Sequence, residues 1–216
     1  MARQALRKID PAFDYSSWLL SIEQLPAPWI DTALFAQARP LEVELGSGKG
    51  LFLSAAAQAW TERNFLGLEM AQKYAHFAAA RLARAQLANA RMVQGDGLRV
   101  FHEYLPSDAL AAVHVYFPDP WWKARHKKRR VMNEHLLRDV ERTLVPGGTL
   151  HFWTDVEEYF HSAIETLHAS TRLVGPFEVA EQNPTHDLDY RTHFERRTRL
   201  HGQPVYRAEF RKAAAT

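Results

Sequence analysis

Short apolar runs alternate with longer segments in which apolar residues recur at helical spacing from about residue 40 onward. The short runs predict strands, and they cover residues 41–45, 64–69, 91–95, 112–117 and 149–154. The longer segments predict helices, and they cover residues 49–60, 71–88, 133–144 and 156–170. Near the C-terminus, residues 205–210 alternate polar and apolar side chains, which is typical of an exposed or edge strand.

Strands that alternate with helices predict βαβ units and an α/β fold. We therefore expect a doubly wound, Rossmann-like sheet that is mostly parallel, with an antiparallel C-terminal strand. Residues 40–216 are expected to form this one domain, and residues 1–39 to be a lead-in that packs on the core or precedes it. Asn133 is predicted to cap the helix over 133–144, and the Pro-Gly-Gly triplet at 146–148 to end it.

Composition narrows the class of protein. The chain has 216 residues, of which 46% are hydrophobic, and it has no cysteine, so disulfides and thiolate metal sites are excluded. No run approaches the roughly 20 apolar residues that span a bilayer. We expect a soluble, cytoplasmic protein without membrane attachment. The net charge is only +2, but seven basic residues including His126 fall within residues 123–130, which favours a directed anionic partner.

A glycine turn follows the first predicted strand of the domain. Gly46, Gly48 and Gly50 allow a tight turn and a close approach of a ligand to the backbone. The segment is not a Walker loop, because Lys49 is followed by glycine, and Leu51 weakens the match to a dinucleotide fingerprint. Glu44 would repel a pyrophosphate, but it suits a ligand that carries an amino group and a sulfonium.

Acids also end the next two predicted strands, at Glu69 and Asp96. The carboxyl ends of parallel strands meet at the ligand-binding edge of such a sheet, so these acids and Glu44 are expected to lie together. A carboxylate at Glu69 can accept hydrogen bonds from two ribose hydroxyls, and one at Asp96 can accept from an adenine amino group. Each acid alone fits a solvated loop equally well. Together with the glycine turn they predict a site for S-adenosylmethionine.

The fourth predicted strand end carries a rigid acid-bearing turn followed by the basic cluster. Pro118 and Pro120 restrict the backbone on either side of Asp119. Trp121 and Trp122 offer flat faces on which a base or ribose can stack. The cations that follow predict contacts with nucleic-acid phosphates, and they are Lys123, Arg125, Lys127, Lys128, Arg129 and Arg130. A basic run is usually a solvated face, but this one follows directly on a predicted ligand-binding edge.

Two later polar segments are less specific. Asp155 follows the strand predicted over 149–154. The residues Thr192, His193, Phe194 and Glu195 mix a hydroxyl, an acid and rings that can contact a polar base edge. The same four residues also fit the start of a surface helix, with Thr192 as its cap and Glu195 at the capping-box position. The residues alone leave both interpretations open.

Taken together, the segments resemble the bacterial tRNA (guanine-N7)-methyltransferases from about residue 40 to 210. The resemblance rests on LEVELGSGKG, FLGLE, YFPDPWWKARHKKRR, THFERR and GQPVYRAEF. It implies that Glu44, Glu69, Asp96 and Asp119 form the S-adenosylmethionine site, with Asp119 also catalytic. It also implies that Lys123, Asp155 and the stretch from Thr192 to Glu195 contact tRNA, whose target is a guanosine in the variable loop. Trp122 departs from the family's usual Pro or His.

Transfer to guanine N7 is expected to need no metal and no general base, because N7 carries a free lone pair. A carboxylate from Asp119 or Asp155 would stabilise the purine as it becomes cationic, and the residues do not decide between them. Three alternatives remain: a methyltransferase for an exocyclic amine, a non-catalytic RNA-binding module and a dinucleotide oxidoreductase. We expect a protein that binds tRNA as a monomer or homodimer.

Overall fold

The computed structural model describes residue 6, residues 8–180 and residues 191–214. In this part of the chain, eight strands form one sheet in the order β1-β4-β3-β2-β5-β6-β8-β7. All neighbours are parallel except β8, which runs antiparallel to β6 and β7. The strands are β1 (Leu19–Ser21), β2 (Leu41–Leu45), β3 (Asn64–Glu69), β4 (Ala90–Gln94), β5 (Leu110–Tyr116), β6 (Leu144–Thr154), β7 (Val174–Phe177) and β8 (Tyr206–Arg211). The expected α/β class is confirmed.

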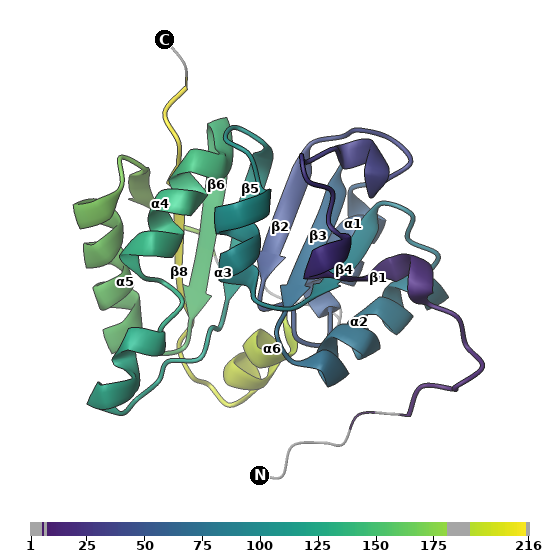
Figure 1. The fold of residues 1–216 in the computed structure, drawn as a ribbon. Helices are drawn as coiled ribbons and strands as arrows, with labels where there is room; N and C mark the ends of the chain where they lie inside the picture. Colours follow the sequence, from purple (N-terminus) through teal and green to yellow (C-terminus); the bar gives the residue numbers. More distant parts are fainter. Residues whose placement is uncertain (1–5, 7, 181–190, 215–216) are drawn as a thin grey trace.

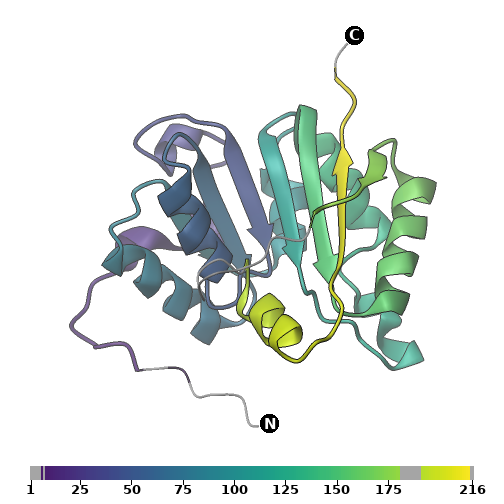
Figure 2. The same ribbon diagram turned by 180° about the vertical axis from the view of Figure 1, so that it is seen from behind.

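Helices cover both faces of the sheet (Figures 1 and 2). They are α1 (Leu51–Ala59), α2 (Gln72–Arg84), α3 (Gly97–Arg99), α4 (Glu134–Thr143), α5 (Glu157–Ser170) and α6 (His193–Leu200). One buried apolar cluster joins the sheet to α1 and α2, and a second joins its other face to α4 and α5. Because β2 lies between β3 and β5, the strand order reverses there, and α6 lies at the carboxyl edge of the sheet beside this point (Figure 1).

The local pattern predicted most elements within a few residues. The strands expected over 41–45 and 64–69 are β2 and β3 with the same bounds. Asn133 caps α4 as expected, since its side-chain oxygen accepts a hydrogen bond from Leu136 N at 3.2 Å. The strand expected over 149–154 begins earlier, at Leu144, because Leu144 pairs with Leu110 before the register shifts to Thr149 opposite Ala112. The Pro-Gly-Gly triplet therefore forms a bulge within β6.

The expectation that residues 205–210 form an exposed or edge strand is wrong. This segment is β8, which lies between β6 and β7, and its Ala208 and Phe210 are fully buried. The pattern alternates because Ala208 and Phe210 face the core, whereas Arg207 and Glu209 pair with Glu195 and His151. The edge strand is β7, whose sequence VGPF contains Gly and Pro and resembles a loop.

At the other edge of the sheet, β1 pairs in parallel with β4, so residues 19–21 contribute a strand to it. The domain boundary at residue 40 stays a prediction. In the described part of the chain, no helix has both the length and the apolar character that a membrane crossing requires.

Candidate active site

The glycine turn after β2 is held tightly against β3. The backbone N–H groups of Gly46 and Ser47 both donate to the carbonyl of Leu68, at 2.9 and 3.0 Å. Gly50 then starts α1 in the left-handed region, with φ of 66°, and a Cβ there would lie 2.7 Å from Cβ of Ala78. Glycine at this position is therefore required both by the backbone conformation and by the packing of α1 on α2.

Glu44 is buried at the end of β2, directly before this turn. Among the described residues, its Oε2 atom has no hydrogen-bond partner. Burial raises the pKa of Glu44 to about 8, a hydrogen bond with Ser47 opposes the rise, and the nearby Glu69 carboxylate adds to it. A buried acceptor without a partner is costly, so this oxygen is available for a cationic donor.

Glu69 connects the ends of β2, β3 and β4. Its Oε2 atom accepts a hydrogen bond from Gly48 N at 2.8 Å, and its Oε1 atom accepts one from Ala71 N at 2.8 Å. Its carbonyl accepts a hydrogen bond from Gly95 N at 3.0 Å, one residue before Asp96. Asp96 in turn caps α3 through a bond from Leu98 N to Oδ1 at 2.9 Å. The structure thus brings the three predicted acid-bearing turns to one edge.

These residues fit S-adenosylmethionine. Among the residues that the structure describes, none bonds to Oε2 of Glu44, which leaves it for a cationic group, and none lies within 4 Å of a Cβ at Gly46 or Gly48. The Glu69 carboxylate retains acceptor capacity beyond its two backbone bonds, because an ionised carboxylate has about four acceptor positions. The arrangement suits a ligand with a positive charge at one end and hydroxyl groups at the other.

The Asp119 turn follows β5, on the other side of the point where strand order reverses. Phe117 N donates to the carbonyl of Trp153 at 2.8 Å, which joins this turn to the end of β6. Phe117 and Trp121 both adopt positive φ, 49° and 46°, which is unusual for large side chains. Asp119 is exposed between them. Backbone strain on both sides of an exposed acid is typical of a functional site, and the sequence did not reveal it.

Most of the basic cluster lies in a short 3-10 helix, Ala124–Arg129, which follows this turn in the chain. Lys123, Arg125, Lys127, Lys128 and Arg129 are exposed. The Arg129 guanidinium lies 5.2 Å from the ring centre of Trp121, whereas Trp122 is 69% exposed. Arg130 differs from the others because it is buried, with its guanidinium bonded to the carbonyl of Pro120 and to Glu158.

Helix α6 brings the late polar segment to the same edge. Thr192 caps it by accepting a hydrogen bond from Glu195 N at 3.0 Å, so the helix-start interpretation describes what these two residues do locally. Glu195 is 3% exposed and accepts a bond from Arg191 N at 2.7 Å. Phe194 is half-exposed and stacks on Phe117 at 6.3 Å between ring centres. The side chain of His193 lies outside what the structure describes.

Asp155 follows β6 and is partly buried, one residue after the fully buried Thr154. Thr154 accepts a hydrogen bond from Val156 N at 3.2 Å, which shapes the turn that carries Asp155. The carboxyl edge of the sheet therefore carries Asp119 after β5 and Asp155 after the neighbouring β6, with the start of α6 beside them. Glu44, Glu69 and Asp96 lie at the same edge, on the other side of the β2–β5 boundary.

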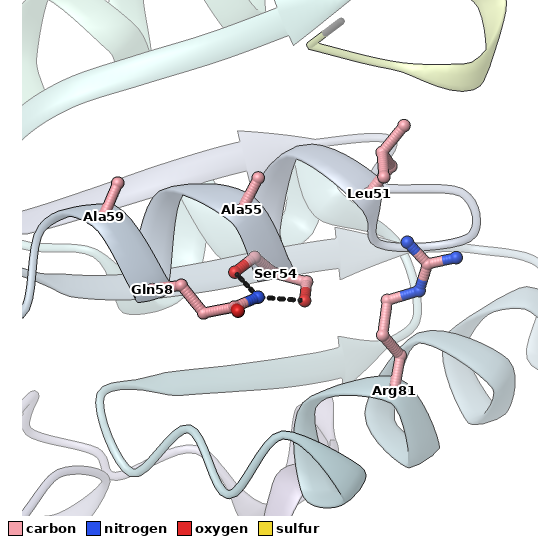
Figure 3. Close-up of a pocket in the computed structure, with 6 residues that line it drawn as sticks. All are labelled: Leu51, Ser54, Ala55, Gln58, Ala59 and Arg81. Carbon is pink, nitrogen blue, oxygen red and sulfur yellow. Dashed lines mark hydrogen bonds between the residues drawn. The ribbon is translucent and has the colours of Figure 1, made fainter. Parts of the chain in front are cut away.

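An open groove of about 320 Å³ lies elsewhere, between α1 and α2 (Figure 3). It is lined by Leu51, Ser54, Ala55, Gln58, Ala59 and Arg81, none of which is a predicted site residue. Gln58 Nε2 donates to the carbonyl and hydroxyl oxygens of Ser54, at 2.9 and 3.2 Å. The strand ends, and not this groove, define the candidate site.

A Rossmann-like sheet with an antiparallel β8, a glycine turn after β2 and an acid at each of the next strand ends defines a class I methyltransferase. Solved structures agree on the fold. The chain superposes on precorrin-6y C5,15-methyltransferase from Geobacter metallireducens with a TM-score of 0.55 and 16% identity, over 82% of each chain. The aminoglycoside resistance methyltransferase NpmB1 gives 0.54 and 18% identity, over 81% of this chain and 88% of that one.

Sequence comparisons identify the family. Residues 38–208 match the family model described as "Putative methyltransferase". A Rhodopirellula baltica protein named tRNA (guanine-N(7)-)-methyltransferase is 47% identical over 98% of this chain and 80% of its own length. A protein of the same name from Dechloromonas aromatica is 37% identical over 83% of this chain and 72% of its own. The chain belongs to the tRNA (guanine-N7)-methyltransferase family.

Proposed function

We propose that this protein transfers a methyl group from S-adenosylmethionine to N7 of a guanosine in tRNA, and that the guanosine lies in the variable loop. The observation that carries the proposal is the buried Glu44 oxygen at the glycine turn, which has no partner in the described part of the chain, in a protein of this family. A buried carboxylate in that position disfavours a phosphate-bearing cofactor and favours a cationic one. This contrast separates the proposal from a dinucleotide oxidoreductase.

Glu44, Glu69 and Asp96 would hold the methyl donor, together with the turn of Gly46, Gly48 and Gly50. When bound, S-adenosylmethionine supplies a methyl group on a sulfonium centre. Glu44 would orient its amino-acid end, Glu69 would accept from the ribose hydroxyls, and Asp96 would accept from the adenine amino group. Two features support these roles: the Glu44 oxygen without a partner in residues 8–180 and 191–214, and the hydrogen bonds that join the three turns.

Asp119 or Asp155 would accept a hydrogen bond from guanine N1–H or from its amino group. A carboxylate there stabilises the positive charge that develops on the purine as N7 is methylated. No side chain has to remove a proton, since N7 carries none. Asp119 is the stronger candidate, because it is exposed between two strained residues at the point where strand order reverses.

The exposed cations Lys123, Arg125, Lys127, Lys128 and Arg129 would contact tRNA phosphates. Phe194 extends the surface with a half-exposed ring that rests on Phe117. Thr192, His193 and Glu195 share the helix start that presents this ring, and so belong to the proposed tRNA-binding region. We expect the reaction to take place in the cytoplasm and the enzyme to act as a monomer or a homodimer.

The purified protein can be incubated with methyl-labelled S-adenosylmethionine and unmodified bulk tRNA, followed by digestion to nucleosides. Label in 7-methylguanosine is the expected result. Label in N6-methyladenosine would indicate a methyltransferase for an exocyclic amine instead. Cofactor binding without any label in tRNA would favour a non-catalytic RNA-binding module.

A further inference from the structure

Arg130 is the last residue of the basic run, but its environment differs from that of its neighbours. It is 7% exposed, whereas Lys127, Lys128 and Arg129 are exposed. Its guanidinium lies 4.6 Å from the ring centre of Tyr159 on α5. A side chain packed in this way is poorly placed to reach a phosphate on a bound nucleic acid.

Four of the five guanidinium N–H bonds of Arg130 are used inside the protein. Nε donates to the carbonyl of Pro120 at 2.8 Å. Nη1 and Nη2 donate to the two carboxylate oxygens of Glu158, at 3.1 and 2.5 Å, and Nη1 also donates to Oγ of Ser162 at 3.2 Å. Planar, bidentate pairing of this kind fixes geometry as well as charge.

The Pro120 carbonyl belongs to the residue directly after Asp119. Arg130 therefore ties the Asp119 turn to α5, whose Glu158 lies 28 residues further along the chain. Proline at 118 and 120 has no N–H with which to brace the turn, and Phe117 and Trp121 hold it in strained conformations. The turn thus depends on an outside donor, and Arg130 is one.

Glu158 anchors this connection. Lys127 Nζ also donates to its Oε1 atom, at 2.7 Å, and hydrogen bonds from Arg130 and Lys127 lower the pKa of Glu158 to about 2. The carboxylate therefore stays ionised not only at neutral pH but also well into the acidic range. The basic loop is joined to α5 through the same acid, so the phosphate-facing side chains and the Asp119 turn share one support.

We propose that Arg130 is a positioning residue that holds the Asp119 turn through Pro120 and Glu158, and not a contact for tRNA phosphates. The inference rests on the proposed function, because it concerns the geometry of that reaction. A misplacement of reacting groups by about 1 Å can cost about 100-fold in rate. Loss of Arg130 is therefore expected to affect the chemical step more than tRNA affinity.

The test compares variants that each remove one positive charge. In Arg130→Met, kcat is expected to fall about 10- to 100-fold, with the dissociation constant for S-adenosylmethionine unchanged and the salt dependence of tRNA binding unchanged. In Lys128→Met, the loss is expected in KM, and the slope of log affinity against log salt is expected to fall by about one. Arg138→Met is the matched control, because Arg138 forms an exposed pair with Glu134 on α4, and its activity should equal that of the wild type.

Two further variants keep the test decisive if Arg130→Met folds poorly. Arg130→Lys preserves the charge but cannot reach Pro120 and both oxygens of Glu158 together, so kcat should stay low. Glu158→Gln alters an acid that is 52% exposed, and it should reproduce the kcat loss. The double variant Arg130→Met with Glu158→Gln should lose no more than Arg130→Met alone, because both act through one connection.

A kcat equal to that of the wild type in Arg130→Met, with a flatter salt slope, would overturn the inference and assign Arg130 to the phosphates. Full activity in both Arg130→Lys and Glu158→Gln would overturn it as well. These results leave the proposed function intact. Absence of 7-methylguanosine with the wild-type protein would instead overturn the proposed function, and this inference with it.

Discussion

Glu44 combines three properties that rarely occur together in a side chain: it is acidic, it is buried, and one of its oxygens has no partner among the described residues. Burial, with a smaller contribution from the nearby Glu69, favours its protonated form and raises its pKa to about 8. A cationic ligand would reverse this preference, because an opposite charge favours the ionised form. The protein without its ligand therefore keeps an acid in a position that is unfavourable for its own stability.

The stability of the ligand-free protein should show this cost. Glu44 ionises near 4.5 in the unfolded chain and near 8 in the folded one, so stability should fall as pH rises from 4.5 to 8 and level off above. The change is about 1.4 kcal/mol per pH unit in that window. In Glu44→Gln this contribution is absent, so the free energy of unfolding of the variant should rise relative to that of the wild type as pH rises. Urea unfolding at pH 5 and pH 8.5 measures it.

The matched control for that experiment is Glu62→Gln, because Glu62 is a largely exposed acid. Its stability should follow the wild-type dependence on pH. An equal pH dependence in Glu44→Gln and the wild type would show that Glu44 ionises normally in the folded protein.

Asp119 is expected to act on the transition state and only weakly on the ground state. Asp119→Ala should therefore lower kcat about 100- to 1,000-fold, the range found when one stabilising group is removed from an active site. The dissociation constant for S-adenosylmethionine, measured by calorimetry, should change far less. Asp155→Ala under the same conditions shows which carboxylate stabilises the guanine cation, since the larger loss of kcat identifies it. Equal losses of turnover and cofactor affinity in Asp119→Ala would contradict its catalytic role.

Among the elements, the site consists of the turns that follow the strands at the carboxyl edge of the sheet. Hydrogen bonds from Gly46, Ser47 and Gly48 connect the first turn to β3, and Gly95 N connects β4 to Glu69. On the other side, Phe117 joins β5 to β6 and stacks on Phe194 of α6. Each turn is held by a neighbouring element, so its conformation depends on the packing of the whole edge.

Gly50 is the position where this packing is tightest. Gly50→Ala places a Cβ 2.7 Å from Ala78 Cβ at a positive φ, whereas Gly147→Ala has a positive φ but no described atom within 4 Å. Gly147→Ala should lose about 1 kcal/mol of unfolding free energy from backbone strain alone. Gly50→Ala should lose about 1–3 kcal/mol more from the clash between α1 and α2, and should also bind S-adenosylmethionine more weakly. Equal losses in the two variants would mean that α2 moves aside at no cost.

At the scale of the whole molecule, charge is distributed unevenly. The net charge is +2, but exposed cations gather beside the Asp119 turn, and acids gather at the strand ends. A polyanion is thus attracted to one region of the surface, next to a site suited to a cationic donor. The tRNA would thus meet a positively charged surface, and the cationic methyl donor would meet acidic side chains.

This distribution predicts the salt dependence of tRNA binding. Replacing both Lys123 and Lys128 by Met should flatten the slope of log affinity against log salt by about two, because each phosphate contact contributes nearly one unit. Lys212→Met is the control, since Lys212 bonds Asp108 and the carbonyl of Leu144 at the amino end of β6. A slope in the double variant as steep as in the control would place the tRNA surface elsewhere.

Most elements of the sheet, and the acids at the strand ends, could be predicted from the pattern of residues along the chain. The apolar runs placed β2 and β3 with the bounds that the structure has, because burial of a strand shows directly in its own residues. Since every βα unit exposes its turn at the same edge, Glu44, Glu69 and Asp96 could be expected together at one edge from the sequence alone. Their detailed roles, and that of Asp119, stay predictions.

Which distant segments meet could be seen only from the way the elements pack. Residues 205–210 show the same alternation in an edge strand as in β8, which lies between β6 and β7. Arg130 is indistinguishable in sequence from the cations before it, yet its partners are Pro120 and Glu158. The pKa of Glu44 likewise follows from burial beneath other elements. A local pattern records how a residue is buried, whereas its partners depend on how remote elements pack, and no short segment contains that information.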